Sequence, residues 1–200
     1  MNYDRELLVH KLQRWEAFVD GYRLPEWEAL PDFGLYMDQV MVLLGEYLSF
    51  IPAAGEDPER LVTASTINNY VRLKIMPAPV KRKYGRVHLA YLIMILTLKL
   101  SLSIGDVQKL LPSHLTEEEV CTLYRSYTEK FQNTGRLFSK QMETARQEAA
   151  DPQLSPDEAA GRMVIQWALN ASFQALLARK MLSLQGADPQ AVLAAEEQEN

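Results

Sequence analysis

Basic side chains are concentrated in one stretch of this 200-residue chain. Between Arg60 and Gly105 the sequence holds eight Lys or Arg residues and no Asp or Glu, which leaves 13 of the 21 basic and all 26 acidic residues elsewhere. The rest of the chain therefore has a formal charge of −13, although the whole chain carries only −5. Such segregation of charge within an acidic protein indicates that one surface binds an anionic partner.

The first part of this stretch is predicted to form a short helix. Thr63 or Ser65 can cap its first turn, because either hydroxyl can accept from a free backbone N–H there. Four apolar residues recur at helical spacing and predict a buried stripe. The stripe consists of Ile67, Tyr70, Val71 and Ile75.

The opposite side of this helix exposes amide, hydroxyl and guanidinium groups. These residues are Thr66, Asn68, Asn69 and Arg72. Asn pairs with the edge of adenine and Arg with that of guanine, and both side chains also bind phosphates. The helix is therefore a candidate for reading nucleic acid, and the alternative is a solvent-facing surface that is merely rich in Asn.

A basic segment bounded by prolines follows, after Lys74. Pro77 and Pro79 fix φ and remove two backbone donors, so the chain cannot continue as a helix. A short hairpin is predicted around Tyr84 and Gly85, and its cations would neutralise phosphates in a salt-dependent way. The cations are Lys81, Arg82, Lys83 and Arg86. The alternative is a turn that serves only solubility.

The order of these parts is that of a winged helix-turn-helix, and it resembles the DNA-binding domain of MerR-type regulators. The chain as a whole is similar to a bacterial family of uncharacterised proteins with this MerR-like core. The elements that carry the resemblance are Asn69-Tyr70-Val71, Ile75-Met76-Pro77, Arg82-Lys83-Tyr84-Gly85-Arg86, and Leu102-Ser103-Ile104 through Val107 to Leu110-Leu111. The resemblance implies that Arg82 and Tyr84 lie against the phosphate backbone. Asn69 and Val71 stand where the family has Arg and Glu, so the resemblance extends to the docking mode and not to base preference.

The remaining apolar periodicity predicts an all-α fold with a small wing. Helices are expected over residues 3–20, 36–50, 87–102 and 104–111, and the third of these is apolar nearly all round, as in a central helix. The Pro- and Gly-rich segment 50–61 is a longer connection than a helix-turn-helix usually has. Three regions result: an N-terminal helical extension (1–35), the MerR-like winged helix-turn-helix domain (36–112) and a C-terminal helical region (113–200).

The C-terminal region is predicted to be a helical hairpin. Thr116 with Glu119, and Ser155 with Glu158, form capping boxes that begin its two helices, and Pro156 occupies the favoured first position of the second. The high apolar content of that second helix has two readings. It can form a homodimer with a second copy, or it can enclose a pocket for a small-molecule effector.

No pattern of catalytic, metal-binding or cofactor-binding residues is present, so we expect a protein that is not an enzyme and uses neither metal nor cofactor. His10, His88 and His114 are dispersed, and a lone Cys121 cannot supply a thiolate metal site. The single cysteine fits a reducing compartment, the N-terminus lacks a signal-peptide core, and the longest near-apolar run, residues 89–98, is too short to cross a membrane. A cytoplasmic location is expected.

The leading hypothesis is a transcription regulator that binds double-stranded DNA as a homodimer, through its C-terminal helices, with the short polar helix and the basic hairpin on one open face. The predicted DNA-contacting residues are Thr66, Asn68, Asn69, Tyr70, Arg72, Lys74, Lys81, Arg82, Lys83, Tyr84 and Arg86. The alternative is a protein-interaction adaptor that keeps the winged fold and uses its basic face for an acidic protein.

Overall fold

A computed structural model of the protein describes residues 2–51 and 62–190. These residues form seven α-helices, one short 3-10 helix (η1) and no strand, so the all-α prediction is confirmed. The elements are α1 (Arg5–Gly21), η1 (Trp27–Ala29), α2 (Met37–Tyr47), α3 (Ala64–Arg72), α4 (Arg86–Leu98), α5 (Ile104–Leu110), α6 (Glu117–Ala150) and α7 (Pro156–Ser183). Of the predicted long connection, residues 50–61, all but the first two lie outside the described residues, and so does Arg60.

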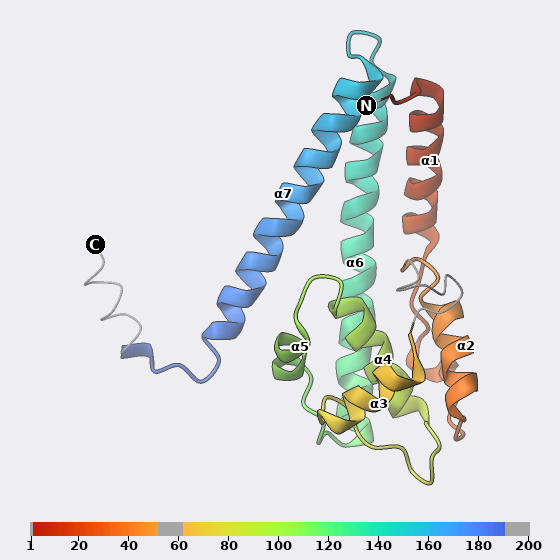
Figure 1. Ribbon diagram of the computed structural model, residues 1–200, viewed down its shortest axis with the longest axis vertical. Helices are drawn as coiled ribbons and strands as arrows, with labels where there is room; N and C mark the ends of the chain where they lie inside the picture. The colour runs from red at the N-terminus through yellow and green to blue at the C-terminus, as the bar shows by residue number, and fades with distance from the viewer. Residues whose placement is uncertain (1, 52–61, 191–200) are drawn as a thin grey trace.

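The molecule has two parts, which Figure 1 shows along its long axis. We call residues 22–51 and 62–131 the head: α2 to α5 gather there around the N-terminal half of α6. The stalk consists of α1, the rest of α6, and α7. No helix in the described parts of the chain is both long and apolar enough to span a membrane.

The helices begin where the sequence supplies a capping side chain. Thr63 caps α3, and its Oγ1 accepts from the backbone N–H of Thr66 at 3.2 Å. Thr116 and Ser155 form the predicted capping boxes at the starts of α6 and α7. Ser103 caps α5 in the same way. Local hydrogen-bonding chemistry thus fixes four of these helix starts.

The head is built around α4, as its lack of a polar face predicts. Every residue from His88 to Thr97 is buried, and α2 and α6 pack against the helix. The hydroxyl of Tyr91 donates to the carbonyl of Pro112, and that of Tyr124 on α6 donates to the carbonyl of Pro25 at 2.8 Å. Burial raises the pKa of Tyr91 to about 12. These phenols therefore bind as neutral donors and tie distant segments to the core.

The stalk has a smaller core of its own. Leu12 of α1 is buried with Ala145 and Ala149 of α6 and with Ala159 and Met163 of α7. Beyond that cluster α7 diverges from α6, so the predicted hairpin closes only near its turn (Figure 1). Small side chains let the three helices approach at one end, and the rest of α7 has few neighbours.

Candidate nucleic-acid interface

Helix α3 is amphipathic, with its apolar and polar residues on the sides that the sequence predicts. Ile67 and Tyr70 are buried in the head core, at 0% and 1% exposure. On the other side, Asn68 and Arg72 are exposed, and Asn69 is partly exposed. The side chain of Arg72 donates from Nη2 to Oδ1 of Asn69 at 2.7 Å. The amide thereby orients the guanidinium along the open face of the helix.

The end of α3 differs from the prediction. The buried stripe was expected to continue helically to Ile75, but the helix ends at Arg72. Lys74 has a positive φ of 55°, and the N–H of Ile75 then bonds back to the carbonyl of Tyr70 at 3.0 Å. This left-handed turn closes the helix in the manner of a Schellman motif. Pro77 disfavours a helical conformation at the preceding Met76, so the helix would in any case be interrupted there.

A groove of about 640 Å³ lies beside α3. It runs between the exposed side of α3 and the segment that joins α4 to α5. Its lining residues are Ser65, Thr66, Asn68, Asn69, Tyr70, Arg72, Lys99, Leu102, Ser103 and Ile104. Among these described residues there are two cations, six hydroxyl or amide groups that include the Tyr70 phenol, and no carboxylate.

Lys99 contributes the second cation from the end of α4. Its Nζ donates to the hydroxyl of Tyr70 at 3.0 Å and lies 5.4 Å from the centre of that ring. The buried phenol therefore holds the ammonium group at the groove. The nearest carboxylate on α5, Asp106, is engaged by the Ser103 hydroxyl at 2.7 Å, which keeps the pKa of Asp106 below its usual value.

The basic loop forms a tighter turn than predicted, and at a different place. Val80 and Lys83 exchange both backbone hydrogen bonds, 3.1 and 2.9 Å, so Lys81 and Arg82 are the two central residues. The hairpin was expected around Tyr84 and Gly85, so its tip lies three residues earlier. Lys81 and Arg82 have positive φ values of 50° and 63°. This is the geometry of a type I′ turn, which normally takes Asn and Gly because other residues are strained there.

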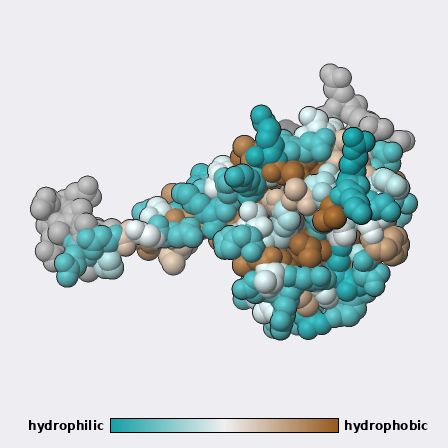
Figure 2. Space-filling model, turned by 90° about the horizontal axis from the view of Figure 1, so that it is seen from below, coloured by the Kyte–Doolittle hydropathy of each residue, from teal (hydrophilic) through white to brown (hydrophobic). Residues whose placement is uncertain are grey.

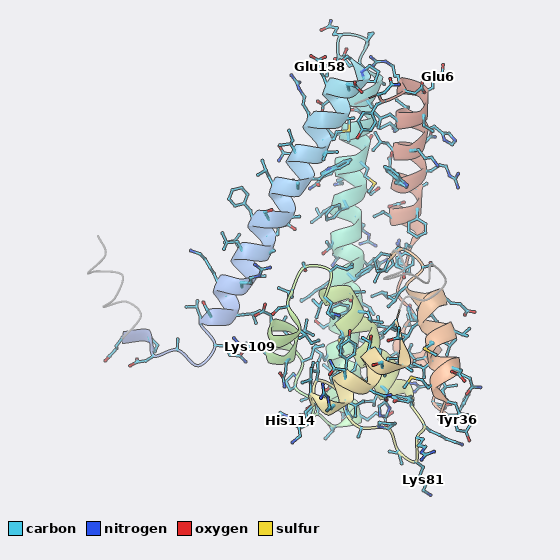
Figure 3. The ribbon with its side chains drawn as sticks, viewed as in Figure 1. Glu6, Tyr36, Lys81, Lys109, His114 and Glu158 are labelled. Carbon is cyan, nitrogen blue, oxygen red and sulfur yellow. The ribbon has the colours of Figure 1, made fainter. Side chains whose placement is uncertain are left out.

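The turn projects from the molecule at the far end of the head. Figure 3 shows Lys81 at that extreme, and α3 lies at the same end in Figure 1. Seen from below in Figure 2, this end is mostly hydrophilic, with separate hydrophobic patches between the polar side chains. The basic turn therefore marks one end of the protein and α3 lies in the same part of the head, whereas the segment between α4 and α5, the other wall of the groove, lies nearer the stalk (Figure 1).

Tyr84 anchors the turn and does not point outward. Its backbone exchanges hydrogen bonds of 2.9 and 2.8 Å with Leu35, and its ring is 3% exposed. The ring meets His88 edge-on, with 5.5 Å between centroids. A direct phosphate contact by the Tyr84 ring, which the family resemblance implies, is not available in this conformation.

His88 closes the base of the same loop. Its Nδ1 accepts from the N–H of Gly85 at 3.0 Å, and its Nε2 lies 3.2 Å from the carbonyl of Ala78. Since Nδ1 accepts, the proton is on Nε2 and the ring is neutral. Burial lowers the pKa of His88, which agrees with a neutral ring.

The side chains of the other two cations of the loop contact other parts of the protein. Arg86 donates from Nε to the carbonyl of Leu30 at 2.9 Å and lies over the ring of Trp27. Lys83 lies 5.4 Å from the centre of the Tyr36 ring and packs against the backbone of Gly34. Lys81 and Arg82 are thus the cations of the turn that face solvent without such contacts.

The predicted residues separate into four groups. Thr66, Asn68, Asn69, Tyr70 and Arg72 line the groove, with the Tyr70 ring buried; Lys81, Arg82 and Lys83 form the turn; Tyr84 and Arg86 are directed inward; Lys74 forms the left-handed turn. Sequence reasoning did not select Lys99, Ser103 or the anchors Gly34 and His88. Lys99 was visible in the acid-free window, and Ser103 was visible as a cap. No local sequence pattern indicates that Gly34 lies against Lys83 or that Leu35 pairs with Tyr84.

No metal site is found in the described parts of the chain, where no group of three or more His, Cys, Asp or Glu side chains could hold an ion. His88 is committed to backbone partners on both nitrogens. Cys121 is a free, partly buried thiol on α6. The groove offers hydrogen-bond donors and positive charge, and these suit a polyanion.

A comparison with protein families matches residues 25–129 to a domain of unknown function (DUF1836). The match spans 105 of the 200 residues, more than half of the chain. The chain belongs to the DUF1836 family. The DUF1836 region coincides with the core of the head, which extends from Leu24 to Tyr124, and it includes all the predicted contact residues. A comparison with curated proteins and with solved structures gives no match.

Proposed function

We propose that this DUF1836 protein is a transcription regulator that binds duplex DNA with the far end of its head. The observation that carries the proposal is the groove beside α3, which has two cations and no carboxylate among its described lining residues. The head that holds this groove also bears the projecting turn with Lys81 and Arg82. An acidic protein whose groove has cations and no carboxylate among its described lining residues is suited to a polyanionic partner.

The groove and the turn have different roles in this proposal. Lys81 and Arg82 bind phosphates, which gives salt-dependent affinity without sequence information. Asn68 and Arg72 face a major groove, where amides and guanidinium groups pair with base edges. Arg72 is oriented by Asn69, as a base-reading arginine needs to be. This division of roles is the one that the sequence resemblance to MerR-like winged helix-turn-helix domains implies, with the turn as the wing.

Tyr70 and Tyr84 act as positioning residues. The buried phenol of Tyr70 holds Lys99 at the groove, and Tyr84 fixes the turn through its backbone pairing with Leu35. Neither ring needs to touch DNA for its substitution to weaken binding. A homodimer completes the proposal, because winged units read two-fold sites in pairs.

The test is the binding of a 30-base-pair duplex of random sequence, followed by fluorescence anisotropy over a salt series. Wild-type protein is compared with a variant carrying Lys81→Ala, Arg82→Ala and Lys83→Ala. The control carries Lys11→Ala, Lys130→Ala and Lys140→Ala, which change the net charge equally at exposed positions outside the proposed face. Loss of up to three phosphate contacts should lower the slope of log K against log salt by about 2 to 3 and the affinity by roughly tenfold or more.

Three results would count against DNA binding at this face. The first is no binding by wild-type protein at low salt. The second is an equal loss in both triple variants, which would mean that only net charge matters. The third is equally tight binding to poly-glutamate, which would favour the adaptor that meets an acidic protein.

A further inference from the structure

Helix α7 exposes more large apolar side chains than a surface helix normally does. Eight of them are between 47% and 69% exposed. They are Val164, Ile165, Leu169, Phe173, Leu176, Leu177, Met181 and Leu184. In Figure 1 this helix runs along one edge of the molecule, apart from α6 over most of its length.

The apolar contacts of α7 lie on one side of the helix, although Arg162 also forms an ion pair of 3.9 Å with Glu148 of α6. Met163 is buried in the stalk core, and near the other end Ala178 packs on the head core. At about 100° per residue, Ile165, Leu169, Phe173 and Leu176 lie roughly 200–280° around the axis from Met163. We call this row the outer stripe. Ile165 lies at the edge of the pocket between α6 and α7. Closing α7 onto α6 would still leave Leu169, Phe173 and Leu176 in water, because they lie on the side of the helix away from Met163.

We propose that the outer stripe of α7 is the interface between two copies of this chain, packed antiparallel. The four side chains of the outer stripe are 47–63% exposed and form one continuous apolar row that a second helix can cover. A stable interface buries about 800 Å² per partner, so the outer stripe would form its apolar centre and the polar and charged side chains beside the stripe its rim. A self-complementary row on one helix is also what a two-fold interface requires.

Charge decides the direction of the two helices. The first turn of α7 carries Asp157 and Glu158, and its end carries Arg179 and Lys180. An antiparallel pair sets the acidic start of each helix beside the basic end of the other and also opposes the helix dipoles favourably. A parallel pair would place acid beside acid and base beside base.

The same charges set the register. Glu158 and Lys180 lie on the side of the helix that bears the outer stripe, at about 220° and 260° from Met163. Pairing Glu158 with the Lys180 of the second copy places Leu169 against Leu169 on the two-fold axis. Ile165 of each copy then lies against Phe173 of the other, so the two-fold axis produces this contact twice.

The inference deepens the proposed function by naming the partner and the face of its dimer, and its test uses no DNA. With Cys121→Ser as background, one protein carries Ile165→Cys and another, longer by a tag, carries Phe173→Cys. After mixing and mild oxidation, the antiparallel register predicts a disulfide-linked heterodimer as the main product. Each protein alone should cross-link weakly, because like positions are about 12 Å apart along the axis. Efficient cross-linking of each protein alone, with no heterodimer, would mean a parallel pair and overturn the proposal.

A second measurement distinguishes the loss of the dimer from the misfolding of a variant. The full chain should sediment as a dimer at micromolar concentration, Leu169→Glu as a folded monomer, and Ala171→Glu as a dimer, because Ala171 is exposed outside the outer stripe. A wild-type chain that is monomeric throughout overturns the inference, and so does a dimer that Leu169→Glu leaves intact. Either result leaves DNA binding by the head testable on its own.

Discussion

Helices α4 and α7 are both rich in apolar residues, and the protein uses them in opposite ways. From His88 to Thr97 every residue of α4 is buried inside the head. Along α7, eight large apolar side chains are about half exposed or more. Apolar composition alone therefore does not decide burial; the number of elements packed around the helix does. Helix α4 stabilises the fold of one chain, and we assign α7 to the contact between two.

The largest effect should separate these two helices directly. Leu92 of α4 has no exposed surface, and Leu92→Ala should lower the free energy of unfolding by about 2–5 kcal/mol through lost burial and a cavity. Leu169→Ala on α7 should change unfolding of the dissociated chain by less than about 0.5 kcal/mol, as at ordinary surface positions. Urea denaturation at low protein concentration measures both. Equal losses would contradict the contrast.

The next effect concerns the contact that holds the basic turn on the head. A Cβ on Gly34 would lie 2.8 Å from Cβ and Cδ of Lys83. Gly34→Ala should therefore cost roughly 1–3 kcal/mol and weaken DNA binding by displacing the turn. Gly45→Ala on α2 is the matched control, since a Cβ there meets nothing within 4 Å, and it should be neutral or stabilising. Comparing thermal unfolding and DNA affinity for the two variants shows whether this head contact matters for function.

A smaller effect of opposite sign is expected at the tip of the turn. Lys81 and Arg82 occupy positions where Asn and Gly are unstrained. The double change Lys81→Asn with Arg82→Gly should raise the free energy of unfolding by about 1 kcal/mol while it lowers DNA affinity. Chemical denaturation and anisotropy on the same samples test both halves. A variant that loses stability, or that binds DNA as well as wild type, would show that the turn is not a strained functional element.

The smallest effect is a pH dependence of the head. Burial lowers the pKa of His88 in the folded protein, so the unfolded chain binds the proton more tightly. The contribution of His88 to the free energy of unfolding should be fully present above about pH 6.5, the ordinary pKa of His. It should decrease as the pH drops below that value. The charged side chains around the same cleft are Asp32, Glu117, Lys81, Lys83 and Arg86.

The matched variant for this pH dependence is His88→Phe, which removes the titrating ring and keeps an aromatic in its place. Its baseline stability will be lower because two hydrogen bonds are lost. Its decline between pH 7.5 and 5.5 should nevertheless be shallower than that of wild type. The exposed His10 and His114 are present in both proteins, so a difference between the two arises at position 88. A decline of equal steepness would show that His88 does not link the head to pH.

Much of the fold could be predicted from the sequence, because local chemistry specifies it. The caps at Thr116 and Ser155 and the central position of α4 follow from short-range patterns and were confirmed. The turn at Lys81 and Arg82 was placed wrongly, because propensity argues against positive φ at such residues. Its position depends on a pairing of Leu35 with Tyr84 that only tertiary structure supplies.

The candidate site was predictable in part for the same reason. The exposed row on α3 follows from helical periodicity, whereas the contribution of Lys99 depends on how α4 packs beside α3. For α7, periodicity identifies apolar rows but does not say whether the partner lies in the same chain.

The most direct test of the proposed DNA-binding face is amide hydrogen exchange of the full chain, with and without a 30-base-pair duplex at low salt. Binding through the head predicts slower exchange in three segments, residues 64–74, 77–86 and 99–105, with no change in α1 or in the first half of α7. Protection confined to the stalk, or none in those three segments at saturating DNA, would contradict the account.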